Sequence, residues 1–284
     1  MDQQGVDQQS VDPEWSDRAE RAEAECFRRM IEDLPAEAGR LIGASVVPVA
    51  DGWHTRVTHD PMGGYWNKAL GFCDPITDDT VARVVEGTRE QGVPVMAFAL
   101  QPRLLPDDWP GIAERHGLSQ GNVMVKFLGP AEPPADAETD LRIERVGVEH
   151  AETFAQVMAT GFGAPWTPGT QAMFSMPAGF DGDWATYAAF DGDTVVGVAR
   201  LLAIPDLDTA YLFGAATLAE ARGRGAQTAL MAARLAEARD RGLTWAGADT
   251  WAEMLPDHPN PSQHNMLRIG LTEVHRRPHW IWKS

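Results

Sequence analysis

The stretch EARGRGAQTALMAARLAEARDRGL, residues 220–243, begins as a glycine-rich turn and continues as a helix that Gly242 ends. An apolar run with strand character, TAYLFGAATL (209–218), precedes it. A second such run, WAGADTW (245–251), follows it. The order is therefore strand, tight turn, helix, strand, and this unit predicts a mixed α/β fold.

The turn from Arg222 to Gln227 has the composition of an anion-binding site. Gly223 and Gly225 allow the backbone to approach a ligand closely, and the first amide groups of a helix have no partner within the helix. Arg222 and Arg224 add positive charge to an acidic chain. The alternative is a surface turn whose arginines serve solubility. The sequence contains no GxxxxGK[ST], HExxH, CxxC or GxSxG motif and no GxGxxG after a strand.

Residues 141–284 resemble the GNAT superfamily of acyl-CoA-dependent N-acetyltransferases over essentially their whole length. The family signature is Arg/Gln-x-x-Gly-x-Gly/Ala at the start of the central helix. Arg222 and Gly225 match this signature, whereas Gln227 stands where the family usually has a small residue. The resemblance implies a mixed α+β sheet whose two central strands splay apart and leave backbone groups free for acetyl-CoA.

The resemblance also implies which residues hold acetyl-CoA, the co-substrate. Backbone amides from Gly223 to Thr228 would wrap the pyrophosphate, and the end of the preceding strand would pair with the pantetheine arm. Asn260 and Ser262 often have counterparts that touch this arm, but helix capping is an equally good reading of both. The expected cofactor-binding residues are Ala215, Ala216, Thr217, Arg222, Gly223, Arg224, Gly225, Ala226, Gln227, Thr228, Asn260 and Ser262.

Acetyl transfer by direct attack of an amine, through a tetrahedral intermediate, needs a base for the ammonium proton and a proton source for the thiolate. Many family members place a tyrosine acid four residues before the glycine of the last helix, but here that position is Met266. A water or another hydroxyl then serves as the proton source. The candidate bases are the carboxylates Asp249 and Glu253, and the alternatives are His258 and His264.

The acceptor is expected to be a small-molecule primary amine. Phe162 and Trp166, in an apolar loop with glycine, are the expected substrate-binding residues, although the same side chains could simply cover the core. Net negative charge favours a cationic acceptor such as a polyamine, an amino sugar or a basic metabolite. Two alternatives stay open. One is a peptide or protein N-acetyltransferase, and the other is a non-catalytic acyl-CoA-binding module, which Gln227 and Met266 suggest.

The length of 284 residues suggests two domains or one large one, and we place two domains on either side of a proline-rich, acidic linker. The first domain shows strands at ASVVPV, HTRV, VPVMAFAL and NVMVKFL, and helices at residues 78–91 and in WPGIAERHG. It has no arginine-glycine helix start, and its order resembles a degenerate GNAT copy or else an accessory α/β domain without a cofactor site. A last pair of strands is expected after Gly270. The predicted division is a disordered tail at 1–13, the first domain at 14–128, a linker at 129–140 and the catalytic domain at 141–284.

Charge and cysteine content limit the partners and the location. The chain has 24 Lys plus Arg against 41 Asp plus Glu, a net charge of −17, which argues against nucleic acid and anionic membranes as partners. Two cysteines are too few for a disulfide framework or a cysteine metal cluster, so we expect a cytoplasmic protein without a metal. No apolar run approaches the roughly 20 residues that span a bilayer. The oligomeric state is left open, a homodimer included.

Overall fold

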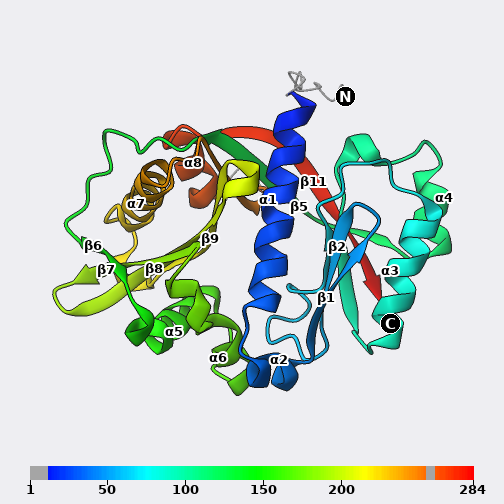
Figure 1. The fold of residues 1–284 in the computed structure, drawn as a ribbon, viewed down its shortest axis with the longest axis horizontal. Coiled ribbons are helices and arrows are strands. Elements are labelled where there is room, and N and C mark those ends of the chain that lie inside the picture. Colours follow the sequence, from blue (N-terminus) through cyan, green and yellow to red (C-terminus); the bar gives the residue numbers. More distant parts are fainter. Residues whose placement is uncertain (1–11, 254–259) are drawn as a thin grey trace.

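The computed structural model describes residues 12–253 and 260–284 (Figure 1). The predicted tail falls mostly on residues 1–11, outside the described residues, and its last residue, Pro13, already begins the first helix. The elements of the first half are α1 (Pro13–Glu32), α2 (Ala36–Ile42), β1 (Ala44–Val49), β2 (Gly52–Val57), β3 (Lys68–Leu70), α3 (Asp78–Glu90), β4 (Val95–Ala99), α4 (Trp109–Arg115) and β5 (Ser119–Pro130).

The second half contains the elements that surround the arginine-glycine turn. They are β6 (Arg142–Val146), α5 (Ala151–Phe162), α6 (Pro168–Phe174), β7 (Trp184–Asp191), β8 (Thr194–Ile204), β9 (Thr209–Thr217), α7 (Ala226–Asp240), β10 (Trp245–Trp251), α8 (Pro261–Arg268) and β11 (Thr272–Lys283). β7 and β8 form a hairpin, in which Asp191 pairs with Thr194 across the turn at Gly192 and Asp193.

The prediction of two strands after Gly270 is wrong, because a single long strand, β11, occupies this segment. Nothing between Thr272 and Lys283 supplies a turn: the one proline, Pro278, lies where the pairing with β5 shifts register. A proline is tolerated at such an irregularity, since the missing amide is not needed there. The strand therefore bends and continues.

The described strands form one eleven-stranded sheet in the order β1-β2-β3-β4-β11-β5-β10-β9-β8-β7-β6. The neighbours β3–β4 and β9–β10 are parallel, and the other neighbouring pairs are antiparallel. Each parallel pair is joined through a helix, α3 in the first half and α7 in the second. The same strand–helix–strand unit thus occurs twice in the chain, as a tandem arrangement requires.

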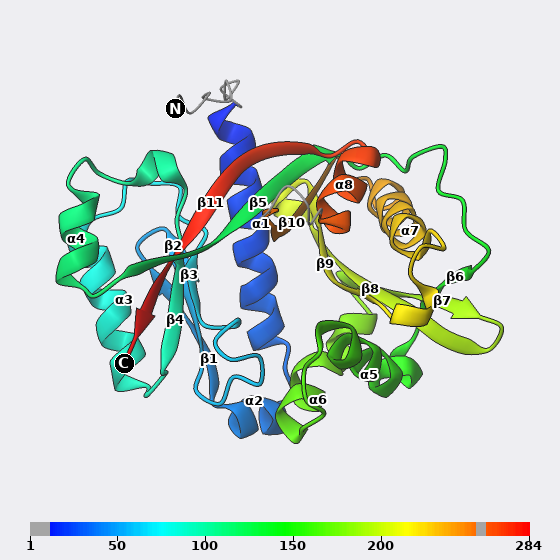
Figure 2. The same ribbon diagram turned by 180° about the vertical axis from the view of Figure 1, so that it is seen from behind.

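The two halves share strands at the centre of the sheet. β11, which comes from the second half, lies between two strands of the first half: it pairs with β5 from Thr272 to Ile281 and with β4 from His279 to Lys283 (Figure 2). β5, which precedes the proline-rich segment, pairs with β10 of the second half. The sheet is therefore continuous across residues 129–140, which we predicted as the linker between two domains. The division into two domains stays a prediction.

Helix α1 lies between the halves and contacts both (Figures 1 and 2). Asp12 caps it by accepting a hydrogen bond from the Glu14 amide at 2.9 Å, and Pro13 occupies the first helical position, where no amide is needed. Its buried side includes Ala22, Cys26 and Met30, at helical spacing. The helix packs on β2, β5, β9, β10 and β11.

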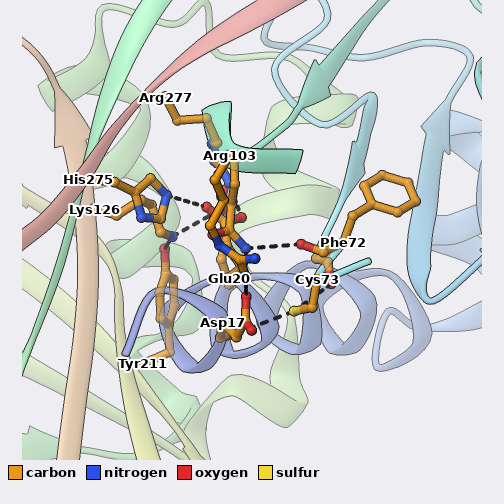
Figure 3. A network of polar contacts seen from close by, with 12 residues as sticks. Asp17, Glu20, Phe72, Cys73, Arg103, Lys126, Tyr211, His275 and Arg277 are labelled. Carbon is orange, nitrogen blue, oxygen red and sulfur yellow. Dashed lines mark hydrogen bonds and ion pairs between the residues drawn. The ribbon is translucent and has the colours of Figure 1, made fainter. Parts of the chain in front are cut away.

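The same helix carries two buried carboxylates into a cluster of cations (Figure 3). Glu23 lies 2.9 Å from Lys126 Nζ and 2.7 Å from a terminal nitrogen of Arg277, and Glu20 pairs with Arg277 and His275. Burial by itself would raise the pKa of Glu23, but Arg277, Lys126 and Lys68 outweigh it and hold this pKa well below its usual range. The cluster therefore joins α1, β3, β5 and β11 by charge.

Replacing Glu23 with glutamine is expected to lower the free energy of unfolding by about 3–5 kcal/mol, because the substitution leaves buried cations without their carboxylate. Chemical denaturation measures this loss. The control is Glu25→Gln, which removes a partly exposed pair with Arg28 and should cost less than about 1 kcal/mol. Equal losses in the two variants would contradict the stabilising role of the cluster.

The same variant has a predicted pH signature. Because the folded-state pKa of Glu23 is depressed, its stabilising contribution is present above the ordinary carboxyl pKa and is lost as the pH falls through the lowered value. The difference in stability between the parent and Glu23→Gln should therefore shrink as the solution is acidified. Denaturation curves recorded at several acidic pH values measure this difference.

Candidate active site

The start of α7 leaves backbone donors free. Gly225, the residue before the helix, has a left-handed conformation with φ of +78°, and among the described residues no side chain caps the helix. The amides of Ala226, Gln227 and Thr228 therefore point out of the first turn without an intrahelical partner. The helix dipole adds partial positive charge at this end, which favours an anion.

A cavity of about 650 Å³, here called the helix-start cavity, opens at this turn. Arg222 and Arg268 are the charged residues among its described lining, which holds no carboxylate. In a chain of net charge −17, a cavity with two guanidinium groups suits a phosphate-bearing ligand. The lining consists of Gly161, Phe162, Ala215, Ala216, Thr217, Ala221, Arg222, Gly223, Gly225, Ala226, Gln227, Thr228, Leu230, Pro261, Asn265 and Arg268.

The corresponding helix of the first half, α3, differs at its start. Thr77 caps α3 by accepting a hydrogen bond from the Thr80 amide at 3.1 Å, and the first turn carries Asp78 and Asp79. A capped amide is no longer free, and two carboxylates repel a diphosphate. The start of α3 therefore differs from that of α7 in capping and in charge, and the absence of a cofactor from residues 14–128 stays a prediction.

Strands β9 and β10 pair only at their beginning. Their parallel register runs from Thr209 opposite Trp245 to Tyr211 opposite Gly247, and beyond this point no pairing continues between them. The strands therefore splay, as the family resemblance implied, and expose the backbone from Leu212 onwards.

A second cavity, of about 380 Å³ and here called the splay cavity, lies where β9 and β10 diverge. It shares Phe162, Ala215 and Gln227 with the helix-start cavity, so the two adjoin. Its walls are mainly aromatic and methionine side chains. The lining consists of Met62, Tyr65, Trp66, Met124, Met158, Phe162, Phe174, Leu212, Phe213, Gly214, Ala215, Gln227, Met231, Arg234, Ala248, Asp249, Thr250, Trp251, Ser262 and Met266.

Asp249 is the carboxylate among the described residues that line the splay cavity. Its Oδ1 accepts a hydrogen bond from the Tyr211 hydroxyl at 2.9 Å. Lys126 Nζ lies 3.3 Å from the same hydroxyl, and Figure 3 shows this second contact. Within the described chain its Oδ2 is buried and has no hydrogen-bond partner. A buried carboxylate oxygen without a donor is costly, so this atom suits a ligand that brings an N–H group.

Tyr211 is fully buried and connects Asp249 to the charged cluster around Glu20 and Glu23. Burial raises the pKa of its hydroxyl well above the ordinary value, and Asp249 and Glu23 raise it further. The phenol therefore stays protonated and donates its proton to Asp249 Oδ1. Lys126, in turn, is held by Glu23.

The other candidate bases lie elsewhere. Glu253 accepts a hydrogen bond from the Asn260 amide at 2.8 Å and lies 2.9 Å from His264 Nε2, and neither Glu253 nor His264 is among the described lining of either cavity. His258 falls outside the described residues. Asp249 is thus the predicted base that the fold brings to a cavity.

The predicted cofactor residues differ in whether they line a cavity. Ala215, Ala216, Thr217, Arg222, Gly223, Gly225, Ala226, Gln227 and Thr228 line the helix-start cavity, and Ser262 lines the splay cavity. The Arg224 side chain instead pairs with Asp191 at 2.6 Å and with Asp140. Asn260 caps α8 by accepting a hydrogen bond from the Ser262 amide at 2.9 Å, as the capping alternative holds.

Gln227, the departure from the family signature, connects the two helices of the site. Its side chain donates to Ser262 Oγ at 3.0 Å and accepts a hydrogen bond from Asn265 Nδ2 at 2.8 Å. A small residue could not span from α7 to α8. Gln227 therefore occupies space that a small residue would leave open, and its hydrogen bonds hold α8 against the start of α7.

Of the two predicted substrate-binding residues, Phe162 lines both cavities, whereas Trp166 is exposed and is absent from their described linings. Trp251, the last residue of β10, is 40% exposed and lines the splay cavity. Sequence reasoning missed Arg268 and Asn265, although their place on the last helix, beside the turn, could have indicated them. It also missed the wall from the first half, Met62, Tyr65 and Trp66, which no local signal marks.

Arg234 is a further residue that sequence reasoning missed. It is buried, lines the splay cavity and donates to the backbone oxygens of Leu230 and Arg200, each at 3.1 Å. Burial lowers the pKa of its guanidinium to about 9. Among the described residues its hydrogen-bond partners are these backbone carbonyl oxygens and not a carboxylate.

Gly225 also packs tightly against the proline-rich segment. A Cβ at this position would lie 2.3 Å from the Glu138 backbone oxygen, and Thr139 Oγ1 donates to the Arg224 oxygen at 2.7 Å. Part of the predicted linker is thus held against the helix start.

Replacing Gly225 with alanine is expected to lower the free energy of unfolding by about 2–4 kcal/mol, because a left-handed backbone strains an L-residue and the new methyl group meets Glu138. Chemical denaturation measures the loss. Gly223→Ala is the matched control, since Gly223 has a φ of +77° but open space around it, and should cost about 1–2 kcal/mol. A loss no larger for Gly225 than for Gly223 would contradict the close contact.

Comparison with known proteins agrees with this geometry. The model of the acetyltransferase (GNAT) family matches residues 152–254, which include β9, the arginine-glycine turn, α7 and β10. Residues 152–254 are a GNAT acetyltransferase domain. The match contains the signature residues and the splayed strands, so the residue-level resemblance and the family model agree. Among curated protein sequences, no significant match to the chain was found.

Solved structures extend the GNAT fold to nearly the whole chain. A GCN5-related N-acetyltransferase from Kribbella flavida matches with a TM-score of 0.58 at 13% identity, covering 91% of this chain and 93% of its own. A putative GNAT acetyltransferase from Novosphingobium aromaticivorans matches with a TM-score of 0.55 at 15% identity, covering 94% and 99%. A tandem GNAT protein from the clavulanic acid biosynthesis pathway matches with a TM-score of 0.52 at 13% identity, covering 98% and 96%.

Proposed function

We propose that the protein is an acetyl-CoA-dependent N-acetyltransferase that acts on a small-molecule primary amine. The observation that carries this proposal is the meeting of two cavities at the splayed strands. One cavity has free helix-start amides and two arginines, and the other has a carboxylate. The family match supports acetyl transfer from acetyl-CoA in general terms. The family match does not identify the acceptor, and the small-molecule primary amine is our addition.

In this proposal the helix-start cavity binds the diphosphate of acetyl-CoA. The amides of Ala226, Gln227 and Thr228 would donate to phosphate oxygens, with Arg222 and Arg268 beside them. The unpaired edge of β9 from Ala215 to Thr217 would pair with the pantetheine arm. The thioester would then reach the point where the two cavities adjoin.

Asp249 is the proposed base, since its unpartnered Oδ2 and its place in the splay cavity suit the removal of a proton from an ammonium group. The free amine would attack the thioester carbonyl and form a tetrahedral intermediate. Binding amine and thioester side by side supplies much of the acceleration. Met266 lines the cavity and donates no proton, so the thiolate would be protonated by water or by a hydroxyl of Tyr65, Thr250 or Ser262.

Calorimetry with acetyl-CoA, together with a thiol-release assay against a panel of amines, tests the function. Binding plus thiol release with a small amine supports the proposal. Binding without turnover over a broad panel would favour the non-catalytic acyl-CoA-binding module, and turnover of peptides alone would favour a peptide or protein N-acetyltransferase. Without binding of acetyl-CoA, the proposal fails.

Several other expectations remain predictions. Within the described residues, no helix is both long and apolar enough to cross a membrane. No group of three or more His, Cys, Asp and Glu side chains in that part of the chain is arranged to hold a metal ion. A cytoplasmic location and a reaction without a metal stay predictions, and the oligomeric state stays open.

A further inference from the structure

One wall of the splay cavity comes from the half of the chain that lacks the anion-binding turn. This wall, Met62–Trp66, is fixed by Asp60, whose carboxylate accepts hydrogen bonds from the amides of Met62 and Trp66, both at 2.7 Å. Thr55 Oγ1 donates to the Trp66 oxygen, also at 2.7 Å. The wall is therefore built into the fold and presents a defined surface to a ligand.

The wall and the strand opposite it form an aromatic enclosure. The Trp66 ring lies edge-on to Tyr65, at a centroid distance of 5.1 Å, and to Phe213 of β9, at 5.8 Å. Met62 and Met158 add thioether groups, which adapt to the shape of an apolar ligand. Such walls gain free energy by covering an apolar body, and aromatic faces also attract a cation.

The charge of the cavity limits how many ammonium groups it can hold. Asp249 and Arg234 are the charged residues in its described lining, so one carboxylate is available for a cation. Lys68 lies 4.3 Å from the centroid of the Tyr65 ring and 3.7 Å from Glu23, a carboxylate that it shares with Lys126 and Arg277. A polyamine or an amino sugar with several charges or hydroxyls would leave most of these polar groups unpaired against apolar walls.

The size of the cavity points the same way. Its volume of about 380 Å³ is near the lower end of the roughly 300–1,000 Å³ that ligand sites occupy. The acetyl end of the co-substrate must share this space. The acceptor is therefore compact.

We propose that the acceptor is a compact primary monoamine with an aromatic or aliphatic body, selected by the Met62–Trp66 wall and anchored through its ammonium group on Asp249. This proposal rests on the proposed N-acetyltransferase function and names its substrate class. The proposal is based on the charged residues that line the cavity. The earlier expectation of a polycation was based on the net charge of the whole chain. In this proposal, residues of the first half form the wall that selects the amine bound at the catalytic site of the second half.

The test compares three amines under identical conditions by acetyl-CoA-dependent thiol release. We expect kcat/KM for 2-phenylethylamine to exceed the values for spermidine and glucosamine by about tenfold or more. Faster turnover of spermidine or glucosamine would overturn this inference but leave the N-acetyltransferase function standing. Binding of acetyl-CoA without turnover of any amine would overturn the N-acetyltransferase function, and the inference with it.

A charge added to the wall tests the position of the acceptor. In Met62→Glu we expect kcat/KM for 2-phenylethylamine to fall about tenfold, and the preference for spermidine over 2-phenylethylamine to rise. The control is Leu41→Glu, which adds the same charge at an exposed position on α2 outside both described linings. Equal effects of the two substitutions on the ratio of amines would overturn the assignment of this wall.

Discussion

The Asp249→Asn variant is expected to lose roughly 10²–10⁴-fold in kcat, the range that a positioned general base contributes. Asparagine keeps an oxygen that can accept the Tyr211 hydrogen bond, so the fold around the splay should persist. It cannot take a proton from an ammonium group. Steady-state thiol release measures kcat, and calorimetry should show an unchanged affinity for acetyl-CoA, because Asp249 lines the splay cavity and not the helix-start cavity.

Glu253→Gln is the matched control for this prediction. Glu253 lies in the same part of the chain but contacts the Asn260 amide and His264 instead of a cavity. We expect its kcat to stay within about threefold of the parent value, which is well under 1 kcal/mol of barrier. If both variants kept full turnover across the pH range, a carboxylate base in this region would be excluded.

The Arg222→Glu variant is expected to bind acetyl-CoA roughly 10- to 100-fold more weakly than the parent. The substitution removes a cation from the helix-start cavity and places an anion beside the proposed diphosphate position. Arg222 is exposed, so the change should spare the fold. Calorimetry measures the affinity, and the defect should shrink at high salt because exposed charges are screened.

Arg83→Glu changes the net charge by the same amount on α3, far along the chain from the turn. Arg83 is 52% exposed and pairs with Asp79. If long-range charge repulsion caused the weaker binding, both variants would show it to the same degree. We expect the affinity of Arg83→Glu for acetyl-CoA to stay within about twofold of the parent value.

The helix start could be predicted from sequence because its function depends on adjacent residues. Gly223 and Gly225 adopt the positive φ that such a turn requires, and α7 runs from Ala226 to Asp240 as the pattern predicted. The splay of β9 and β10 was an expectation that the family resemblance implied. The single strand β11 was missed, because its continuity depends on pairing with β4 and β5 and not on a local pattern.

The sequence by itself determined the local features of this protein: the arginine-glycine turn, the helix behind it, the strands on either side and the carboxylate at the end of β10. Only the tertiary structure decided which of these features share a cavity. Glu23 meets Arg277 across 254 positions of chain, and the Met62–Trp66 wall faces Phe213. Such contacts depend on how the two halves exchange strands around α1, and short-range patterns carry no information about distances of that kind.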